Sequence, residues 1–256
     1  MNILTVADFF HPDVVGGSSI VIDEIMRRLV GRGHHVTVLT RSTHKSIRKY
    51  GEIEVRTYAV PTAEFKYPLA VARCLKAIRE IMGLRKYDLI NSHHAFSGFA
   101  VELSRRLSRR AVPSVFYFHG PWYKEALAKD RVVLVDGQGP MDGLPLKYRF
   151  RRGIERSILK SCRAIVGLSD YMLREANDIY PGIAFKFRKV PGGVDIDRFT
   201  PHADKRGLAK ELGLPEDKTI LLTIRRLSPR MGLENLVRAM AIVAEERDDV
   251  HLVIGG

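Results

Sequence analysis

The loop "FFHPDVVGGSS" (9–19) holds residue types that suit the binding of an anion. Gly16 and Gly17 stand between an apolar run and an amphipathic segment, and glycines let the backbone approach a ligand closely. A helix that begins there presents free N–H groups and the positive end of its dipole, and Ser18 or Ser19 can cap it. The alternative is a tight turn that leads into a capped helix, and the glycine pair alone favours that simpler interpretation.

His119, in "FHGPW", follows a predicted buried strand, at the edge where α/β proteins form sites. A lone histidine at such a place is as often structural as functional, but the following Gly-Pro-Trp indicates a shaped pocket. His93 and His94 also follow a predicted strand, and together with His119 and His11 they raise the question of a metal site. No pair has the i, i+4 spacing of a helical zinc motif and no carboxylate is interleaved, so we expect no metal.

Three arginines in "IRRLSPRMGLENL" (224–236) follow a predicted strand and precede a predicted helix. Cationic side chains and the positive end of a helix dipole converge at such a place, which suits a diphosphate. Arg226 and Arg230 are the candidates, with Arg225 beside them. An exposed basic turn explains the same residues equally well.

Strand-like and helix-like segments alternate along the chain. Continuous apolar runs predict buried strands at 2–7, 35–40, 53–58, 87–93, 113–120 and 164–169. Helical spacing of apolar residues predicts a first helix on Val21, Ile25 and Leu29, a second on Val71, Leu75, Ile78 and Met82, and others at 97–109 and 146–161. The alternation predicts an α/β fold with a doubly wound, Rossmann-like parallel sheet. The Gly/Pro-rich stretch 121–145 is expected to be a mobile surface loop.

The pattern restarts after "KVPGGVDIDRFTP" (189–201), with a strand at 219–227, a helix at 233–246 and a strand in "HLVIG". One strand–helix–strand unit has too little core for a domain, so we interpret it as the opening of an incomplete second Rossmann-like domain. The expected domains are 1–195 and 196–256. A dinucleotide-binding dehydrogenase is disfavoured, because the sequence has no G-x-G-x-x-G motif.

The amino-acid composition limits which binding partners and which cellular compartment are expected for the protein. The chain has 256 residues, 45% of them apolar, and 42 Lys and Arg against 29 Asp and Glu give a net charge of +13. Nucleic acid, anionic lipid and phosphorylated small molecules are candidate partners, but no aromatic-interleaved motif supports nucleic acid. Two distant cysteines, no signal-peptide pattern and no apolar run long enough to span a bilayer predict a cytoplasmic protein.

Five segments, taken in order, resemble the retaining nucleotide-sugar glycosyltransferases of family 4: "HPDVVGGSS", "GHHVTVLT", "FHGPW", "VPGGVDIDRFTP" and "RRLSPRMGLENLVRAM". The resemblance implies the two-domain glycosyltransferase-B fold, with an acceptor-side N-terminal domain and a donor-binding C-terminal domain. It implies a hexosyltransferase that moves a sugar from a nucleotide-diphosphate donor to a glycan or lipid-linked acceptor of the cell envelope. Configuration would be retained, and no cofactor is implied.

The resemblance also implies roles for individual residues. Gly16 and Gly17 match the glycine loop near the donor phosphates, and His119 matches the histidine beside the transferred sugar. Asp195 and Phe199 match the "N-G-V-D-x-x-x-F" segment that crosses between the domains, although a glycine replaces the usual Asn.

Arg226 matches the arginine of the family's phosphate clamp, but Met231 occupies the position of the usual lysine. The clamp would then depend on Arg226, helped by Arg225 or Arg230. In the family, the strand that ends in "VIGG" is followed by the rest of the donor domain, with its Glu, seven residues, Glu motif. We therefore expect a truncated enzyme with little activity by itself. The alternatives are an inactive acceptor-binding fragment and another enzyme of the same fold, such as a sugar-nucleotide epimerase.

The segment "LKYRFRRGIERSILK" (146–160) carries an apolar stripe between basic residues. Leu146, Phe150, Ile154 and Ile158 recur every four residues, with Lys and Arg on both sides. This pattern is typical of a helix that docks on an anionic membrane, here the inner face, where each basic residue contributes about 1 kcal/mol. It also describes an ordinary helix with its stripe in the core and a solvated basic face, and this second interpretation is favoured.

Overall fold

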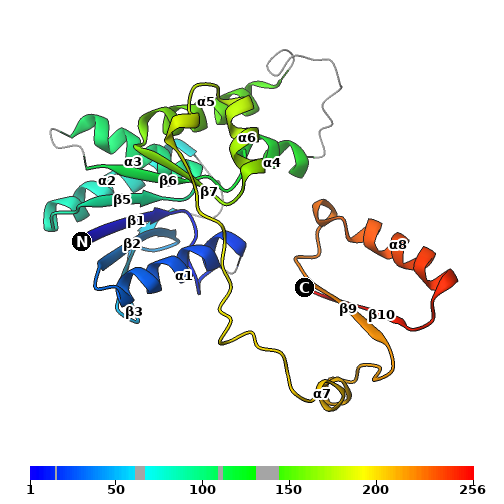
Figure 1. The fold of residues 1–256 in the computed structure, drawn as a ribbon. Helices are drawn as coiled ribbons and strands as arrows, with labels where there is room; N and C mark the ends of the chain where they lie inside the picture. Colours follow the sequence, from blue (N-terminus) through cyan, green and yellow to red (C-terminus); the bar gives the residue numbers. More distant parts are fainter. Residues whose placement is uncertain (15, 61–66, 109–111, 131–143) are drawn as a thin grey trace. The chain divides into compact units, whose positions relative to one another are not determined.

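The computed structural model describes residues 1–14, 16–60, 67–108, 112–130 and 144–256 (Figure 1). They form two compact units, Met1–Gly192 (unit 1) and Gly193–Gly256 (unit 2), and each is described by itself. Unit 1 is an α/β domain around an eight-stranded, mostly parallel sheet, which confirms the predicted fold class. None of the described helices is long and apolar enough to cross a membrane.

The strands of unit 1 are β1 (Asn2–Ala7), β2 (His35–Ser42), β3 (Ile47–Tyr50), β4 (Ile53–Ala59), β5 (Leu89–Ser92), β6 (Ser114–Tyr117), β7 (Ala164–Gly167) and β8 (Phe187–Lys189). Their order is β3-β4-β2-β1-β5-β6-β7-β8, and only β3 with β4 is an antiparallel pair. The helices are α1 (Gly17–Gly31), α2 (Tyr67–Leu84), α3 (Ala95–Leu107), α4 (Trp122–Lys129), α5 (Leu146–Ser161) and α6 (Asp170–Ile179), with the short η1 (Ala184–Lys186). The chain thus starts near the middle of the sheet and winds outward in both directions.

The central strands are apolar throughout because both faces of the sheet are covered. On one face, Val36 and Val38 of β2 pack with Ile22 and Met26 of α1. On the other, residues of β1 and β2 pack with α2 and α3. Figure 1 shows α1 on the opposite side of the sheet from α2 and α3.

The buried faces of α1 and α2 differ from the predicted stripes. In α1, Ile22 and Met26 are fully buried, whereas Ile25 and Leu29 only flank the same cluster. The buried residues of α2 are Ala70, Cys74, Ala77, Ile78 and Ile81. Small residues occupy the centre of this face because α2 packs closely against α3, so the large apolar residues that define a stripe in the sequence lie at its margin.

The stretch 121–145, predicted as a mobile loop, contains α4. Tyr123, Ala126 and Leu127 of this helix are buried, at the i, i+3, i+4 spacing that one helix face requires. Residues 131–143 lie outside the described residues. The edge strands β3 and β8 were not predicted, because β3 has no buried residue and β8 has only one, so neither shows the apolar run of a central strand.

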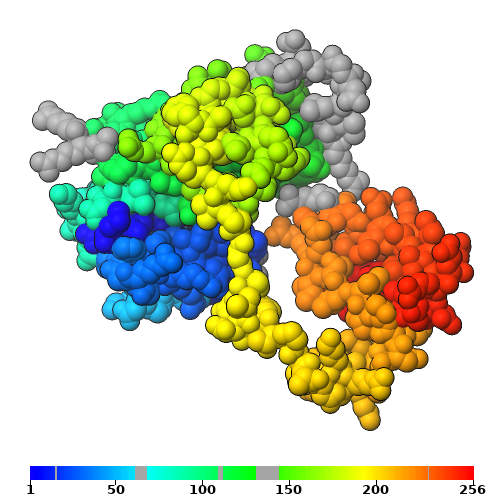
Figure 2. All heavy atoms as spheres, viewed as in Figure 1, coloured from blue at the N-terminus to red at the C-terminus, as the bar shows by residue number. Residues whose placement is uncertain are grey.

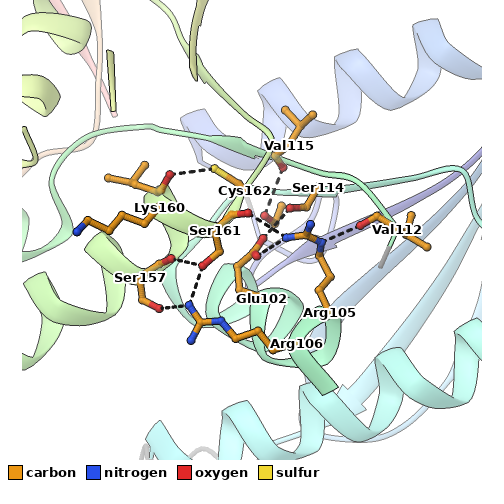
Figure 3. Close-up of polar contacts among 12 residues, drawn as sticks. Glu102, Arg105, Arg106, Val112, Ser114, Val115, Ser157, Lys160, Ser161 and Cys162 are labelled. Carbon is orange, nitrogen blue, oxygen red and sulfur yellow. Dashed lines mark hydrogen bonds and ion pairs between the residues drawn. The ribbon is translucent and has the colours of Figure 1, made fainter. Parts of the chain in front are cut away.

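A buried carboxylate joins α3 to β6 and to the end of α5 (Figure 3). Glu102 is 1% exposed, and its Oε1 accepts a hydrogen bond from Ser114 Oγ at 2.6 Å. Its Oε2 lies 2.5 Å from Nη1 of Arg105, which also donates to the carbonyl of Ser161 at 3.1 Å. Arg105 Nε donates to the carbonyl of Val112 at 2.7 Å. One guanidinium therefore holds together α3, the segment before β6 and the end of α5.

Unit 2 contains α7 (Lys205–Glu211), β9 (Thr219–Ile224), η2 (Pro229–Met231), α8 (Leu233–Glu246) and β10 (Val250–Gly255), with β9 and β10 as a parallel pair. No described side chain of this unit is buried. Residues 188–207 around the unit boundary are all exposed, and Figure 2 shows them in yellow as a narrow run of chain. A single strand–helix–strand arrangement leaves the apolar surface of unit 2 largely uncovered.

Candidate functional site

The candidate site lies at the carboxyl edge of the unit 1 sheet. β1 has β2 on one side and β5 on the other, which makes a topological switch point, the usual place for a ligand in an open α/β sheet. Polar residues stand at or just beyond the ends of these strands and of β6: Asp8, Arg41, His93, His94 and His119. Gly16 and Gly17 belong to the same edge, because they are the N-cap and the first residue of α1, the helix that follows β1.

His94 connects the glycine loop to the strand ends. Its Nδ1 accepts a hydrogen bond from the backbone N–H of Asp8 at 3.0 Å, so the proton of the neutral ring lies on Nε2. That Nε2 is 3.2 Å from Ser18 Oγ, in the first turn of α1. Burial, with a smaller contribution from Arg41, lowers the pKa of His94 to about 4. The neutral ring therefore donates to Ser18, whose own hydroxyl proton remains for another acceptor.

α1 begins at Gly17 with Gly16 as its N-cap, and within the described part of the chain no side chain caps it. The predicted capping by Ser18 or Ser19 is therefore wrong: Ser19 Oγ donates to the carbonyls of Val14 at 2.6 Å and of Gly16 at 2.8 Å. Apart from Gly17 itself, its two chain neighbours and the nearby backbone of α1, no described atom lies within 4 Å of the place where a Cβ on Gly17 would stand. The N-terminus of this helix can thus present backbone N–H groups to an anion.

His93 and His119 form a hydrogen-bonded pair. His93 Nδ1 is 3.3 Å from His119 Nε2, and the two rings are stacked with centroids 5.5 Å apart. His93 Nε2 is 3.0 Å from Nδ2 of Asn91, and the His93 ring also stacks on Tyr117 at 4.4 Å. With the Asn91 amide in this orientation, His93 donates its Nδ1 proton to His119 Nε2, and His119 carries its own proton on Nδ1.

Both imidazoles of this pair are neutral at pH 7. Burial lowers the pKa of His119 to about 4, with a smaller contribution from His94, and lowers that of His93 well below its ordinary value. A neutral imidazole exchanges a hydrogen bond without adding charge. His119 therefore suits a hydrogen bond with an uncharged ligand group such as a hydroxyl.

Asp8 brings a carboxylate to the same edge. It is 6% exposed, and its Oδ1 accepts a hydrogen bond at 3.2 Å from the backbone N–H of Ser97, in the first turn of α3. Burial raises the pKa of Asp8 to about 6, against the opposing effects of Arg41 and the N–H groups of Ser97 and Phe96. The charge of Asp8 is therefore balanced by Arg41 and by the N-terminus of α3.

The described residues contain no group of three or more His, Cys, Asp and Glu side chains that could hold a metal ion. The two cysteines, Cys74 and Cys162, are buried and free. Burial raises the pKa of Cys162 to about 12, so this thiol is not a nucleophile at neutral pH.

The remaining predicted residues lie in unit 2. Arg226 is exposed after β9, and neighbouring Arg225 donates to Met231 Sδ at 3.4 Å. The Arg230 side chain lies outside the described residues. Asp195 Oδ1 accepts from two backbone N–H groups that follow it, at 3.2 and 3.1 Å, and Phe199 is 65% exposed.

The structure thus brings Gly16, Gly17 and His119 to one sheet edge, through His94 and Ser18. From the sequence, His94 is a candidate only as a metal ligand, and Asp8 is not a candidate site residue. The sequence feature that could have identified both residues is their position after a predicted strand: Asp8 directly follows the first apolar run, and His94 lies at the end of another.

Residues 15–198 match Glycosyltransferase Family 4. A D-inositol 3-phosphate glycosyltransferase of Acidothermus cellulolyticus is 30% identical over 240 residues, which cover 88% of this chain and 50% of that protein. A protein of the same name from Nocardioides sp. is 27% identical over 238 residues, covering 88% and 49%. The chain spans about half the length of these curated relatives.

Solved structures share the fold. Sucrose-phosphate synthase from Thermosynechococcus elongatus aligns with a TM-score of 0.75 at 20% identity, covering 100% of this chain and 62% of that one. HepE from Anabaena, solved with UDP and glucose, aligns with a TM-score of 0.64 at 18% identity, covering 98% and 60%. These likenesses show the glycosyltransferase-B fold. Because the family match covers most of the chain, including Gly16, Gly17 and His119, the chain belongs to glycosyltransferase family 4.

Proposed function

We propose that the protein transfers a sugar from a nucleotide-diphosphate donor to a glycan or lipid-linked acceptor, with retention of configuration. Unit 1 is the acceptor side and unit 2 belongs to the donor side. The observation that carries the proposal is neutral His119, paired with His93 at the switch point beside the glycine-started helix α1. The UDP and glucose in the HepE structure support a nucleotide-sugar donor.

The site residues suit the stabilisation of a leaving diphosphate. As the bond from the sugar carbon to the phosphate oxygen breaks, negative charge grows on the diphosphate, and fixed donors stabilise it. The first-turn N–H groups of α1 after Gly16 and the Arg226 guanidinium are the proposed donors. His119 Nδ1–H contacts a hydroxyl of the transferred sugar.

A protein base for the acceptor hydroxyl is not evident among the described residues. His119, with a pKa of about 4, is a weak base at pH 7, and Asp8 is engaged with α3. This supports a front-face route, in which the acceptor oxygen bonds to the sugar carbon as the phosphate leaves. The acceptor proton then passes to an oxygen of the leaving phosphate, so that no protein group needs to keep it.

Transfer assays with a panel of nucleotide sugars test this proposal, with D-inositol 3-phosphate among the acceptors. In a protein that carries a complete donor domain, we expect Arg226→Ala to lower kcat/KM about 10²-fold or more, as for the loss of a charged donor to the leaving group, and we expect His119→Ala to impair transfer as well. His44→Ala, an exposed histidine on another part of unit 1, is the matched control and should change nothing. Met231→Lys should raise kcat/KM, because it restores the usual cation. If Arg226→Ala leaves kcat/KM unchanged while Arg230→Ala lowers it strongly, then Arg230 and not Arg226 binds the phosphate.

An acceptor-binding role without turnover is the second candidate. It is favoured by the lack of buried side chains in the described part of unit 2. Acceptor binding that depends on His119, without sugar transfer from any donor, would support it. In either case we propose a cytoplasmic protein that reaches lipid-linked acceptors at the inner face of the membrane.

A further inference from the structure

The loop that carries His119 is short, and hydrogen bonds fix both of its ends. Residues 119–121 join Phe118 to Trp122, the first residue of α4. At one end, Phe118 N–H donates to the carbonyl of Val166 at 2.8 Å. At the other, Trp122 N–H donates to Oε1 of Glu155 at 3.2 Å. A loop of three residues between two fixed points has little freedom, so these two bonds limit where the loop presents the imidazole, which also contacts His93.

Glu155 reaches this loop from the middle of α5. It is 2% exposed, and its second oxygen, Oε2, accepts a hydrogen bond from the hydroxyl of Tyr180. The first N–H groups of a helix have no acceptor inside the helix, so the Glu155 carboxylate supplies the acceptor for the Trp122 N–H. Burying a carboxylate to cap a helix lowers the stability of the fold. Residues that lower stability locally are expected at sites that function requires.

We propose that Glu155 is a positioning residue for His119: from α5 it holds the start of α4, and so it fixes the loop that presents the imidazole to the site. What His119 touches rests on the proposed function. The link from Glu155 to Trp122 and the loop does not.

The charge of Glu155 changes close to neutral pH. Burial raises its pKa to about 7, against the hydrogen bonds from Tyr180 and Trp122. The other charged and titratable groups around it come from α4, α5 and α6: Tyr123, Glu125, Arg152, and Glu175 with its partner Lys124. Protonation turns a charge-assisted bond to Trp122 N–H into a weaker neutral one. The loop should therefore loosen as the pH falls through about 7.

Trp122 is the single tryptophan of the chain, so its fluorescence reports on this loop. Its ring lies 4.7 Å from that of Phe96, edge to face, with the Arg151 guanidinium 5.0 Å above it. We expect Trp122 emission to titrate with a midpoint near pH 7 in the unmodified chain and to be flat over this range in Glu155→Gln, which cannot ionise. The matched control, Glu125→Gln in the first turn of α4, should keep the titration. A titration that persists in Glu155→Gln would overturn the proposal.

Imidazole ¹⁵N NMR reads His119 directly, with its signals assigned by their loss in His119→Gln. At pH 8 we expect Glu155→Gln to keep the Nδ1–H signal pattern, because the amide oxygen still accepts from Trp122. Glu155→Ala should lose it, and Glu125→Gln should not. An unchanged His119 pattern in folded Glu155→Ala, checked by circular dichroism, contradicts the proposal. If that variant does not fold, the fluorescence comparison with Glu155→Gln decides.

Neither readout requires turnover, so the proposal can fail separately from the proposed function. In a transfer assay, Glu155→Ala should lower kcat about tenfold or more with little change in KM, and Glu155→Gln should restore it. If both spectroscopic results hold while His119→Ala transfers normally, the function assigned to His119 is wrong and the positioning by Glu155 stands.

Discussion

At the residue scale, burial of the Asp8 carboxyl destabilises its ionised form and so lowers the stability of the fold at neutral pH. The raised pKa of Asp8 gives the direction of this effect with pH. The pKa is raised from 3.8 to about 6, so folding favours the protonated carboxyl. The stability from this group is fully present below the unfolded pKa and is lost as the pH rises through about 6. At pH 8 we expect Asp8→Asn to have a higher free energy of unfolding than the unmodified chain, by up to about 3 kcal/mol, and so a higher unfolding temperature. The difference should shrink by pH 4.

The comparison with exposed Asp178→Asn, measured by the same thermal unfolding, isolates the burial effect. A lower stability of Asp8→Asn at pH 8 would mean that the bonds from Ser97 and the charge of Arg41 outweigh desolvation.

His119 was predictable from the sequence, because one local pattern places it after a strand. The bond from Asp8 to His94 was not, since these residues are 86 positions apart and only the strand order brings them together.

At the element scale, α5 has the predicted bounds, but its apolar stripe divides between two roles. Ile154 and Ile158 are buried in the core, whereas Leu146 is 80% and Phe150 is 55% exposed. Several of the basic residues are engaged within unit 1; for example, Lys147 pairs with Asp130 at 2.7 Å. The period of a stripe predicts a helix but does not indicate where its core contact ends, because that depends on which elements pack beside it.

The membrane hypothesis therefore narrows to the first turns of α5. We propose that Leu146, Arg149 and Phe150 contact anionic lipid, with about 1 kcal/mol from the arginine. Arg149→Gln should lower binding to anionic vesicles about fivefold at low salt, and Leu146→Ser with Phe150→Ser should lower it further. Exposed Arg79→Gln on α2 is the matched control. Equal co-sedimentation with neutral and anionic vesicles, or binding that high salt does not weaken, would exclude this contact.

At the scale of the whole molecule, the alternation of strands and helices predicted the doubly wound sheet, because each central element has a long apolar run. Edge strand β3 was not predicted because it has no buried residue. Helix α4 was not predicted because it lies in the stretch 121–145, which is rich in Gly and Pro. The two units also differ in burial, as the single strand–helix–strand pattern of unit 2 predicts. β9 and β10 are as apolar as the strands of unit 1, yet no described side chain of unit 2 is buried.

This difference predicts how the chain unfolds. All buried side chains among the described residues belong to unit 1, so unit 1 should unfold cooperatively and unit 2 should contribute little. We expect a chain of residues 1–192 to keep the unfolding midpoint of the longer chain to within about 4 °C, which is the largest shift that about 1 kcal/mol would produce in a domain of this size.

The exposed apolar residues of unit 2 provide the second measurement. They include Leu221, Leu222, Ile224, Leu227, Val237 and Ile242. Uncovered apolar surface binds the dye ANS, so the longer chain should show higher ANS fluorescence at low temperature than residues 1–192. Leu222→Ser with Ile242→Ser should lower ANS binding without moving the main transition, because neither side chain is buried. A large fall in the midpoint on removal of unit 2, or equal ANS binding by the two chains, would show instead that these side chains are covered in solution.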